Sequence, residues 1–359
     1  MGDCEQRSKE QRTKTEFKVL KAYNGDCILI KSFDECGKDI VILIDGGTSS
    51  TFDFSLKKEI EEVKCIDLII LTHIDSDHIG GLIRFFKNTL INKIEIKNIW
   101  VNFPEIIEIA SGEKISFGQA KTLERLILEK IPKAIVKNFI HSENDKVNFN
   151  GVEITIISPT KEILNDLYEN WPKGNKFKTS NEIKANISKD TELVMNAPLS
   201  ELNKLAFIPD KTIRYDLINA SSISIILECP DLKLLLLADS RPEIIEQYLT
   251  KNYSIDNKIK VDYVKISHHG SKNNTSQNML NYIDCDKYII STNGGTSIHK
   301  HPSRETIARI IYNEMRDFKV QRFIYFNYSI VDIKKRIGNF ISNSDINEGN
   351  WTVDNKNEF

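Results

Sequence analysis

The chain contains seven histidines, and six of them lie in three short segments, at 73–78, 268–269 and 299–301. Each segment lies at or shortly after an apolar run that is typical of a buried strand. Because α/β proteins carry their active sites at the C-terminal ends of strands, we expect the three segments to meet at one site. Imidazole binds divalent cations, so this gathering predicts a metal centre.

The densest segment is THIDSDHIGG at 72–81, where two histidines and two aspartates lie within six positions. It follows an apolar run at 66–71, so a strand that ends and turns into a helix would point most of these side chains inward. No cysteine is near, so a structural zinc site of the cysteine type is not expected. A helix cap would explain one aspartate but neither histidine. The segment predicts as metal ligands His73, Asp75, Asp77 and His78.

Asp239 follows the apolar run at 232–237 and is a candidate to bridge two cations. Its alternative role is the N-cap of a helix at 242–250. His268 and His269 belong to another strand end, and if the strand continues through them they face opposite ways, so only one reaches the site. His299 and His301 alternate in the same way, and one of them is expected on the surface.

The elements that would position these residues include more strands than helices. Short β-rich runs separated by turn residues predict antiparallel strands at the start of the chain. The segment 160–218 is polar and without a clean period, and we interpret it as a partly helical insertion or cap. The expected strands are 17–22, 27–31, 40–44, 66–71, 97–101, 134–136, 152–157, 222–228, 232–237, 263–267 and 288–291, and the expected helices are 54–63, 79–86, 116–130, 242–250, 276–283 and 303–314.

This order of elements fits a two-sheet core with helices outside, a layered α/β arrangement. We expect a flexible N-terminal tail at 1–14, one domain at 15–337 that carries the insertion, and a C-terminal tail at 338–359. Within these bounds, 320–337 has strand character and 338–350 is loop-like.

The composition is that of a globular protein, with 40% hydrophobic and 28% charged residues over 359 positions. A net charge of −2 argues against a general nucleic-acid coat protein, but not against an enzyme that binds a few phosphates. The six cysteines form no C-x-x-C pair and lie mostly in apolar runs, as expected of a cytoplasmic protein. The polar start is not that of a signal peptide, and no apolar run reaches the ~18 residues of a membrane span.

Several ordered motifs resemble those of one family. THIDSDHIGGL resembles the signature loop of metallo-β-lactamase-fold hydrolases, T-H-x-H-x-D-H-x-G-G. NGDCILI and LIDGG are similar to its opening strands, NASSISIILECPDLKLLLLADS to the segment before its bridging aspartate, and ISHHGSKNNTS and STNGG…HKHPS to its final segments. The motifs most resemble the metallo-β-lactamase domain of the DNA-uptake protein ComEC, over 15–330 except the insertion. The resemblance implies an αββα sandwich of two mixed β-sheets packed face to face, with helices outside.

The resemblance also implies roles for single positions. His73 would bind a first cation, Asp77 and His78 a second, and Asp239 would bridge the two, with His301 as the last ligand of the second cation. Asp77, His268 and His269 would take part in catalysis, with His268 favoured near the scissile phosphate. Asp45 would orient the metal ligands from behind with its carboxylate. The implied substrate contacts are Ser271, Lys272 and His299.

Two departures from the family pattern concern the first cation. Asp75 stands where the family has a histidine, and no histidine lies between His141 and His268, where the family often has its third ligand. Asn219 or Ser221 could take its place. A site with more oxygen and less nitrogen favours Mn²⁺ or Mg²⁺ relative to Zn²⁺.

The chain is therefore predicted to be a hydrolase with two divalent cations, Mn²⁺ or Zn²⁺ or alternatively Mg²⁺, that uses a metal-bound hydroxide. The favoured substrates are phosphodiesters, in nucleic acid or a nucleotide, with Lys265, Lys272 and Arg304 near the site to hold phosphate. Two alternatives remain. One is a hydrolase of a small ester, thioester or lactam, which would normally keep the full histidine set. The other is a catalytically weak interaction module of a multi-protein system, whose insertion would suit a protein partner; a homo-oligomer is compatible with all three.

Overall fold

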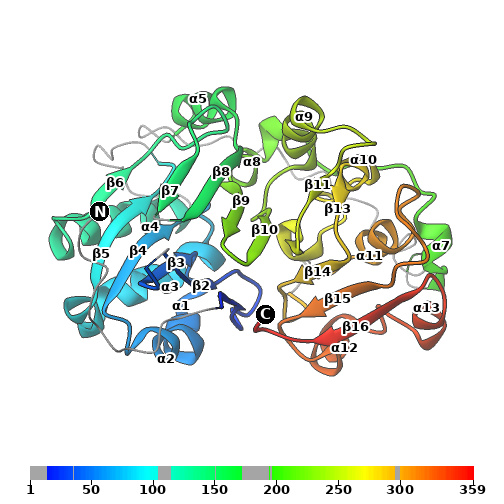
Figure 1. Cartoon of the computed structure of the whole chain (residues 1–359), viewed down its shortest axis with the longest axis horizontal. Helices are drawn as coiled ribbons and strands as arrows, with labels where there is room; N and C mark the ends of the chain where they lie inside the picture. The colour runs from blue at the N-terminus through cyan, green and yellow to red at the C-terminus, as the bar shows by residue number, and fades with distance from the viewer. Residues whose placement is uncertain are drawn as a thin grey trace.

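The computed structural model describes residues 14–34, 36–103, 115–149, 151–171, 194, 196–295 and 300–359. Two sheets form its centre (Figure 1). The first has six strands in chain order: β1 (Glu16–Val19), β2 (Ile28–Phe33), β3 (Asp39–Ile44), β4 (Cys65–Ile70), β5 (Glu95–Trp100) and β6 (Ile135–Lys137). The pairs β1–β2 and β2–β3 are antiparallel, and the later pairs of this sheet are parallel.

The second sheet has eight strands in the order β16-β15-β14-β12-β10-β9-β8-β7. Its antiparallel half contains β7 (Val147–Phe149), β8 (Val152–Ser158), β9 (Ser224–Cys229) and β10 (Leu232–Leu236). Its parallel half continues from β10 through β12 (Tyr263–Lys265), β14 (Lys287–Ile290), β15 (Arg322–Phe326) and β16 (Trp351–Asn355). A separate two-stranded sheet pairs β11 (Ile259–Lys260) with β13 (Ile283–Asp284).

Helices flank the sheets. Those of the first half are α1 (Ser49–Thr51), the π-helical η1 (Phe52–Leu56), α2 (Lys57–Ile60), α3 (Ser76–Lys87), η2 (Thr89–Lys93), α4 (Ile115–Lys130) and α5 (Lys161–Glu169). Those of the second half are α7 (Leu199–Leu202), η3 (Ile213–Tyr215), α8 (Leu217–Ala220), α9 (Pro242–Asn252), η4 (Ser267–Gly270), α10 (Gln277–Asn281), α11 (Arg304–Ile311), α12 (Ile330–Ile337) and α13 (Asn343–Asn347).

Three hydrophobic cores define four layers. One core lies between the two sheets and joins Ile42 and Ile70 of the first to Ile225 and Leu234 of the second. A second core packs α3 and α4 on the outer face of the first sheet. A third packs α9, α10 and α11 on the outer face of the second sheet. Burial of both faces explains the continuous apolar run of β4, and the predicted αββα sandwich is confirmed.

The C-terminal region differs from the prediction. The strand expected within 320–337 ends at Phe326 and is followed by α12. The expected C-terminal tail contains α13 and β16, and β16 pairs in parallel with β15 at the edge of the second sheet. Trp351 is 3% exposed and donates its indole N–H to the carbonyl of Asp345 at 2.7 Å. The segment after 338 is therefore part of the fold, and the tail prediction is wrong there.

The predicted insertion at 160–218 is partly helical in its described residues, which include α5, α7, η3 and α8. Leu164 of α5 packs into the core on the outer face of the first sheet, whereas Leu199 of α7 packs into the core on the outer face of the second sheet. The insertion is thus joined to both halves at its ends. Most of the predicted N-terminal tail, and 172–193 of the insertion, lie outside the described residues.

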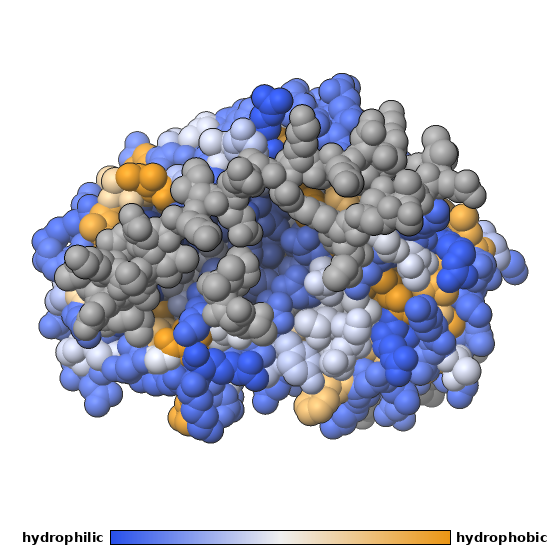
Figure 2. Space-filling view, turned by 180° about the vertical axis from the view of Figure 1, so that it is seen from behind, coloured by the Kyte–Doolittle hydropathy of each residue, from blue (hydrophilic) through white to orange (hydrophobic). Residues whose placement is uncertain are grey.

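Within the described part of the chain, no helix has the length and apolar character needed to cross a membrane. On the face shown in Figure 2, hydrophobic residues form small separate groups among hydrophilic ones. The described surface of that face therefore has the mixed character of ordinary protein surface.

Candidate metal centre

Strand ends from both sheets meet at the predicted site. Asp45 directly follows β3, and the segment 72–78 follows β4, its parallel neighbour. Asp239 and the pair 268–269 follow β10 and β12, which are parallel neighbours in the second sheet. The backbone N–H of Ile223 donates to the carbonyl of Thr72 at 3.0 Å and joins the two sheets here.

Asp239 is the centre of the cluster. Its Oδ2 lies 3.4 Å from Nε2 of His78 and 3.5 Å from Nε2 of His269. The same oxygen lies 3.8 Å from Nε2 of His268 and 3.9 Å from Nε2 of His73. Four imidazole nitrogens from two sheets therefore surround one buried carboxylate.

Neither Asp75 nor Asp239 caps a helix with its side chain. Asp75 occupies the N-cap position of α3, but in the described structure its carboxylate accepts no capping hydrogen bond. Its Oδ2 lies instead 3.7 Å from Nε2 of His73. The N-cap of α9 is Arg241, two positions beyond Asp239. The capping alternatives considered for these residues do not apply, and both side chains face the cluster.

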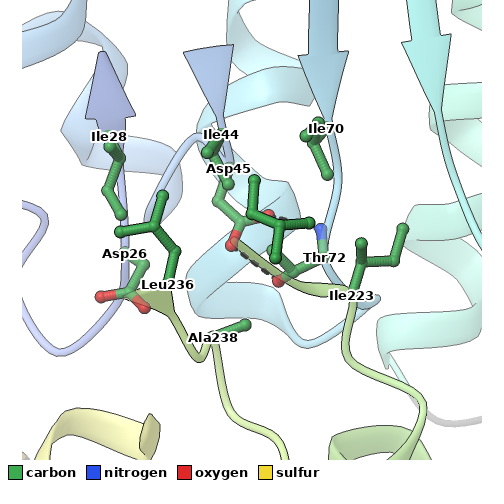
Figure 3. A pocket seen from close by; sticks show the side chains of 10 residues that line it. Asp26, Ile28, Ile44, Asp45, Ile70, Thr72, Ile223, Leu236 and Ala238 are labelled. Carbon is green, nitrogen blue, oxygen red and sulfur yellow. Dashed lines mark hydrogen bonds between the residues drawn. The ribbon is translucent and has the colours of Figure 1, made fainter. Parts of the chain in front are cut away.

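Thr72 and Asp45 fix the rings of His73 and His78. Oγ1 of Thr72 donates to Oδ2 of Asp45 at 2.7 Å, so it accepts from Nδ1 of His73, 3.0 Å away. Oδ2 of Asp45 also accepts from Nδ1 of His78 at 2.7 Å. Figure 3 shows Asp45 and Thr72 joined in this way. In its neutral form each ring thus carries its hydrogen on Nδ1 and directs the lone pair of Nε2 at the cluster.

Asn274 and Ser291 fix the other two rings. Nδ2 of Asn274 donates to two backbone carbonyls after β10, at 3.1 and 3.2 Å. Its Oδ1 therefore accepts from Nδ1 of His268 at 3.1 Å. Nδ1 of His269 donates to the carbonyl of Ser291 at 2.9 Å. With Nδ1 held in this way, these rings too direct Nε2 at the cluster, an arrangement typical of metal ligands.

The cluster fits divalent cations. Among the described residues, no hydrogen-bond partner exists for the buried Nε2 atoms of His73, His78 and His269, nor for Oδ1 of Asp239. Buried lone pairs without a partner are costly, so a bound group is needed to satisfy them. The ligand atoms of His73, His78 and Asp239 lie within 4.8 Å of one another, as do those of Asp77, His78 and His269. Imidazole and carboxylate together are the donors that such cations prefer.

The pKa values of the clustered side chains also favour a bound cation. Although 38% of its side chain is exposed, desolvation and the charge of Asp77 raise the pKa of Asp75 to about 7. Desolvation alone would lower the pKa of His78, but the carboxylates of Asp239 and Asp45 hold it well above its usual value. The cluster attracts positive charge, and we expect cation binding to release protons from it.

The turn after β12 corrects one prediction. His268 and His269 both adopt left-handed backbone conformations, with φ of 47° and 55°. The alternation of a strand does not continue through them, and both rings turn to the cluster instead of facing opposite ways. Asp45 and Ala238 are also left-handed, with φ of 57° and 46°. Such strained backbone is found preferentially at functional sites.

His301 is placed differently from the prediction. The ring of His301 lies beside that of His268, with 5.5 Å between centroids. His301 belongs to none of the groups of candidate metal ligands formed by the described residues. Nε2 of His269, in contrast, lies 3.9 Å from Oδ2 of Asp77. His299 lies outside the described residues.

The two residues considered as substitutes for a third histidine lie at the end of α8, shortly before Ile223, which bonds to Thr72. Nδ2 of Asn219 donates to Oδ1 of Asp216 at 2.9 Å, and its own Oδ1 is buried and accepts no hydrogen bond from the described residues. Ser221 uses its hydroxyl to donate to the carbonyl of Ile218 at 2.7 Å. Asn219 is therefore the better oxygen donor of the two.

The predicted phosphate-binding residues divide into two groups. Lys265 is buried and paired with Asp26, and Arg304 is 4% exposed and bonded to Asp345 at 2.9 Å. Since neither of these cations faces solvent, the prediction that they hold phosphate is wrong. Lys272 is exposed, with its Nζ 4.0 Å from Asp210. Ser271 is buried, and its hydroxyl accepts from the backbone N–H of Asn273 at 3.2 Å.

Three site residues were not singled out from the sequence: Asn24, Asp26 and Asn274. The first two belong to an Asn-Gly-Asp turn, which is typical of any hairpin. Asn274 stands in the polar run KNNTS, where nothing distinguishes it from its neighbour Asn273. Their roles depend on contacts between segments far apart in sequence.

The chain belongs to the metallo-beta-lactamase superfamily, whose sequence profile matches residues 20–294. It is similar in structure to the metallo-beta-lactamase fold protein YhfI from Bacillus subtilis, at 10% identity over 96% of this chain and 97% of that one, with a TM-score of 0.39. It is also similar to unliganded yeast PDE1, at 12% identity, 95% and 97% coverage and a TM-score of 0.42. Similarity at this level carries no argument about activity. No curated protein matches the chain in sequence.

Proposed function

We propose that this superfamily member is a phosphodiesterase or nuclease that uses two divalent cations. The observation that carries the proposal is the cluster itself: four imidazole Nε2 atoms lie within 3.9 Å of one oxygen of Asp239. The rings are fixed by acceptors behind them, which is how ligands are held ready for a metal.

The proposed ligands fall into two sets that share Asp239. His73 and Asp75 would hold the first cation, with Asn219 as a further oxygen donor. Asp77, His78 and His269 would hold the second. His269 thus replaces His301 in the second set, because its Nε2 lies near both Asp77 and Asp239.

When bound, two divalent cations supply Lewis acidity that activates water and neutralises charge on a phosphate. The chain's own residues hold and orient the cations and confine the reacting group. Because carboxylates outnumber imidazoles in the first set, Mn²⁺ or Mg²⁺ is favoured relative to Zn²⁺.

His268 is the proposed catalytic histidine that faces substrate. It is the most exposed of the four rings, with 28% of its side chain accessible against 4% for His269. Burial lowers the pKa of His268, so its Nε2 is an acceptor near neutral pH. From this position it would accept the proton released by the attacking water and donate it to the leaving-group oxygen.

The two adjacent histidines are expected to fail differently when replaced. His268→Ala should lower kcat by roughly 100-fold or more, the lower range for general acid–base groups, while the protein keeps its bound metal. His269→Ala should lose metal from the second set. Elemental analysis of both purified variants beside their kinetics separates the roles, and equal metal loss in both would contradict the assignment.

The proposed activity is tested by hydrolysis of bis-p-nitrophenyl phosphate after metal stripping, with Mn²⁺, Mg²⁺ or Zn²⁺ added back. Release of nitrophenolate that depends on the cation and vanishes in Asp77→Ala would support the proposal and identify the metal. If metal is bound but nothing is released with any cation, the small-ester hydrolase or the interaction module would gain support instead.

Within the superfamily, a particular resemblance to the ComEC domain remains part of this proposal. A cytoplasmic location is proposed as well. Among the described cysteines, Cys27, Cys65, Cys229 and Cys285 are free thiols, as a reducing compartment would require. The natural substrate class is then a phosphodiester of a nucleic acid or nucleotide.

A further inference from the structure

Lys265 and Asp26 form a buried ion pair between the two sheets. Lys265 ends β12 and is 0% exposed, whereas Asp26 precedes β2 and is 2% exposed. Nζ of Lys265 donates to the Asp26 carboxylate and, at 3.3 Å, to the carbonyl of Ala238, the residue before Asp239. Burying two charges is costly, so a pair at this place calls for an explanation beyond packing.

The pair lies against the proposed metal ligands. Oδ1 of Asp26 lies 3.6 Å from Nδ1 of His269 and accepts no hydrogen bond from the described residues. The ligand atoms of Asp26, Asp239 and His269 lie within 4.8 Å of one another. In Figure 3, Asp26 and Asp45 both line a small cavity, about the size of one water molecule, between the sheets. Asp26 is therefore close enough to the cluster to become a ligand itself.

The turn that carries Asp26 also holds Asp77. Nδ2 of Asn24 donates to Oδ2 of Asp77 at 2.7 Å. Gly25 packs so closely on Asp77 that a Cβ there would lie 1.7 Å from its carbonyl oxygen. The turn thus contacts Asp77 directly and, through Lys265, the carbonyl of Ala238 beside Asp239.

We propose that Lys265 is a positioning residue that binds the Asp26 carboxylate, keeps it out of the coordination of the second cation and so sets the cation affinity of the site. Charge supports this assignment. Five carboxylates and one ammonium group leave four negative charges, which two divalent cations neutralise. The five carboxylates are those of Asp26, Asp45, Asp75, Asp77 and Asp239.

The inference rests on the proposed cation site but not on the reaction, so it is tested by cation affinity. Lys265→Met removes the ammonium and frees Asp26 to join the ligands, and we expect Mn²⁺ to bind about tenfold tighter or more. Asp26→Asn leaves the ammonium unbalanced beside the cation, and we expect binding about tenfold weaker or more. The double variant should return to within a few-fold of wild type. Calorimetric titration of metal-stripped protein with Mn²⁺, Zn²⁺ and Mg²⁺ measures all three.

A merely structural role would weaken binding in both single variants and would not give opposite signs. Circular dichroism checks that each variant is folded. If Lys265→Met does not fold, adding it to Asp26→Asn should still restore affinity, and a further loss would overturn the proposal.

Lys272→Met is the matched control, because this lysine lies in the segment that follows β12 and 45% of its side chain is exposed. Its cation affinity should stay within about twofold of wild type. Unchanged affinity in Lys265→Met with a raised KM for bis-p-nitrophenyl phosphate would make Lys265 a substrate contact and overturn the proposal. A wild-type protein that binds Mn²⁺ but hydrolyses nothing would defeat the proposed function alone.

Discussion

Asp239→Asn is expected to abolish hydrolysis and to weaken cation binding by more than the roughly 10- to 100-fold typical of residues behind metal ligands. The substitution keeps the size of the side chain but replaces one anionic oxygen of the proposed bridge by an NH₂ group. That group cannot bind a cation, and it faces the Nε2 atoms that now surround Oδ2. Metal content by elemental analysis and kcat on bis-p-nitrophenyl phosphate should fall together.

Asp256→Asn is a suitable control, because Asp256 is exposed in the loop after α9 and the same chemical change there should alter neither quantity. The thermal unfolding midpoint of metal-stripped Asp239→Asn should stay close to that of metal-stripped wild type, since the amide can donate to the same rings. A variant that retains both metals and full turnover would contradict the bridging role.

The ligand cluster could be predicted largely from local sequence. His73, Asp75, Asp77 and His78 follow one strand within six positions, so a single turn presents them together. The last ligand of the second cation, His269, could be assigned only from the backbone conformation of the pair 268–269. A strand pattern predicts that such neighbours diverge, and only two consecutive left-handed residues bring both to the site.

The roles of lysines and arginines could not be predicted in the same way. Lys265 and Arg304 resemble solvated charges in the sequence, but both are buried by segments far away in the chain. Asp26 lies 239 positions from Lys265, and Asp345 lies 41 positions from Arg304. The first pair follows from the packing of the two sheets and the second from the packing of α11 and α13, and neither leaves a local signal.

The fold could be predicted to the level of its layers, because buried strands and amphipathic helices have distinct periods. The last strand escaped prediction, since β16 is five residues long and stands among polar residues. Its stability derives from parallel pairing with β15 and from the burial of Trp351. A short edge strand of this kind has weak local propensity and is fixed by tertiary contacts.

Gly81→Ala is expected to destabilise the protein by about 3 kcal/mol or more, at the upper end of overpacking effects. Gly81 lies in the first turns of α3, which dock on the turn after β3: its N–H donates to the carbonyl of Gly47 at 2.9 Å. A Cβ at this position would lie 1.8 Å from the carbonyl oxygen of Gly46, which is backbone and cannot rotate away. The helix would have to move, and with it His78, whose ring is held by Asp45 in that same turn.

Gly118→Ala, the same substitution in another helix, is not expected to destabilise the protein. Gly118 lies in α4, and a Cβ there would meet nothing within 4 Å. This variant should be neutral or more stable by up to about 1 kcal/mol, because alanine loses less backbone entropy than glycine when a helix forms. Urea unfolding of the metal-stripped proteins measures both changes, and cation titration should show a loss for Gly81→Ala alone. Equal stability of the two variants would mean that α3 does not approach the turn as closely as its packing indicates, and the placement of His78 against Asp45 would then need revision.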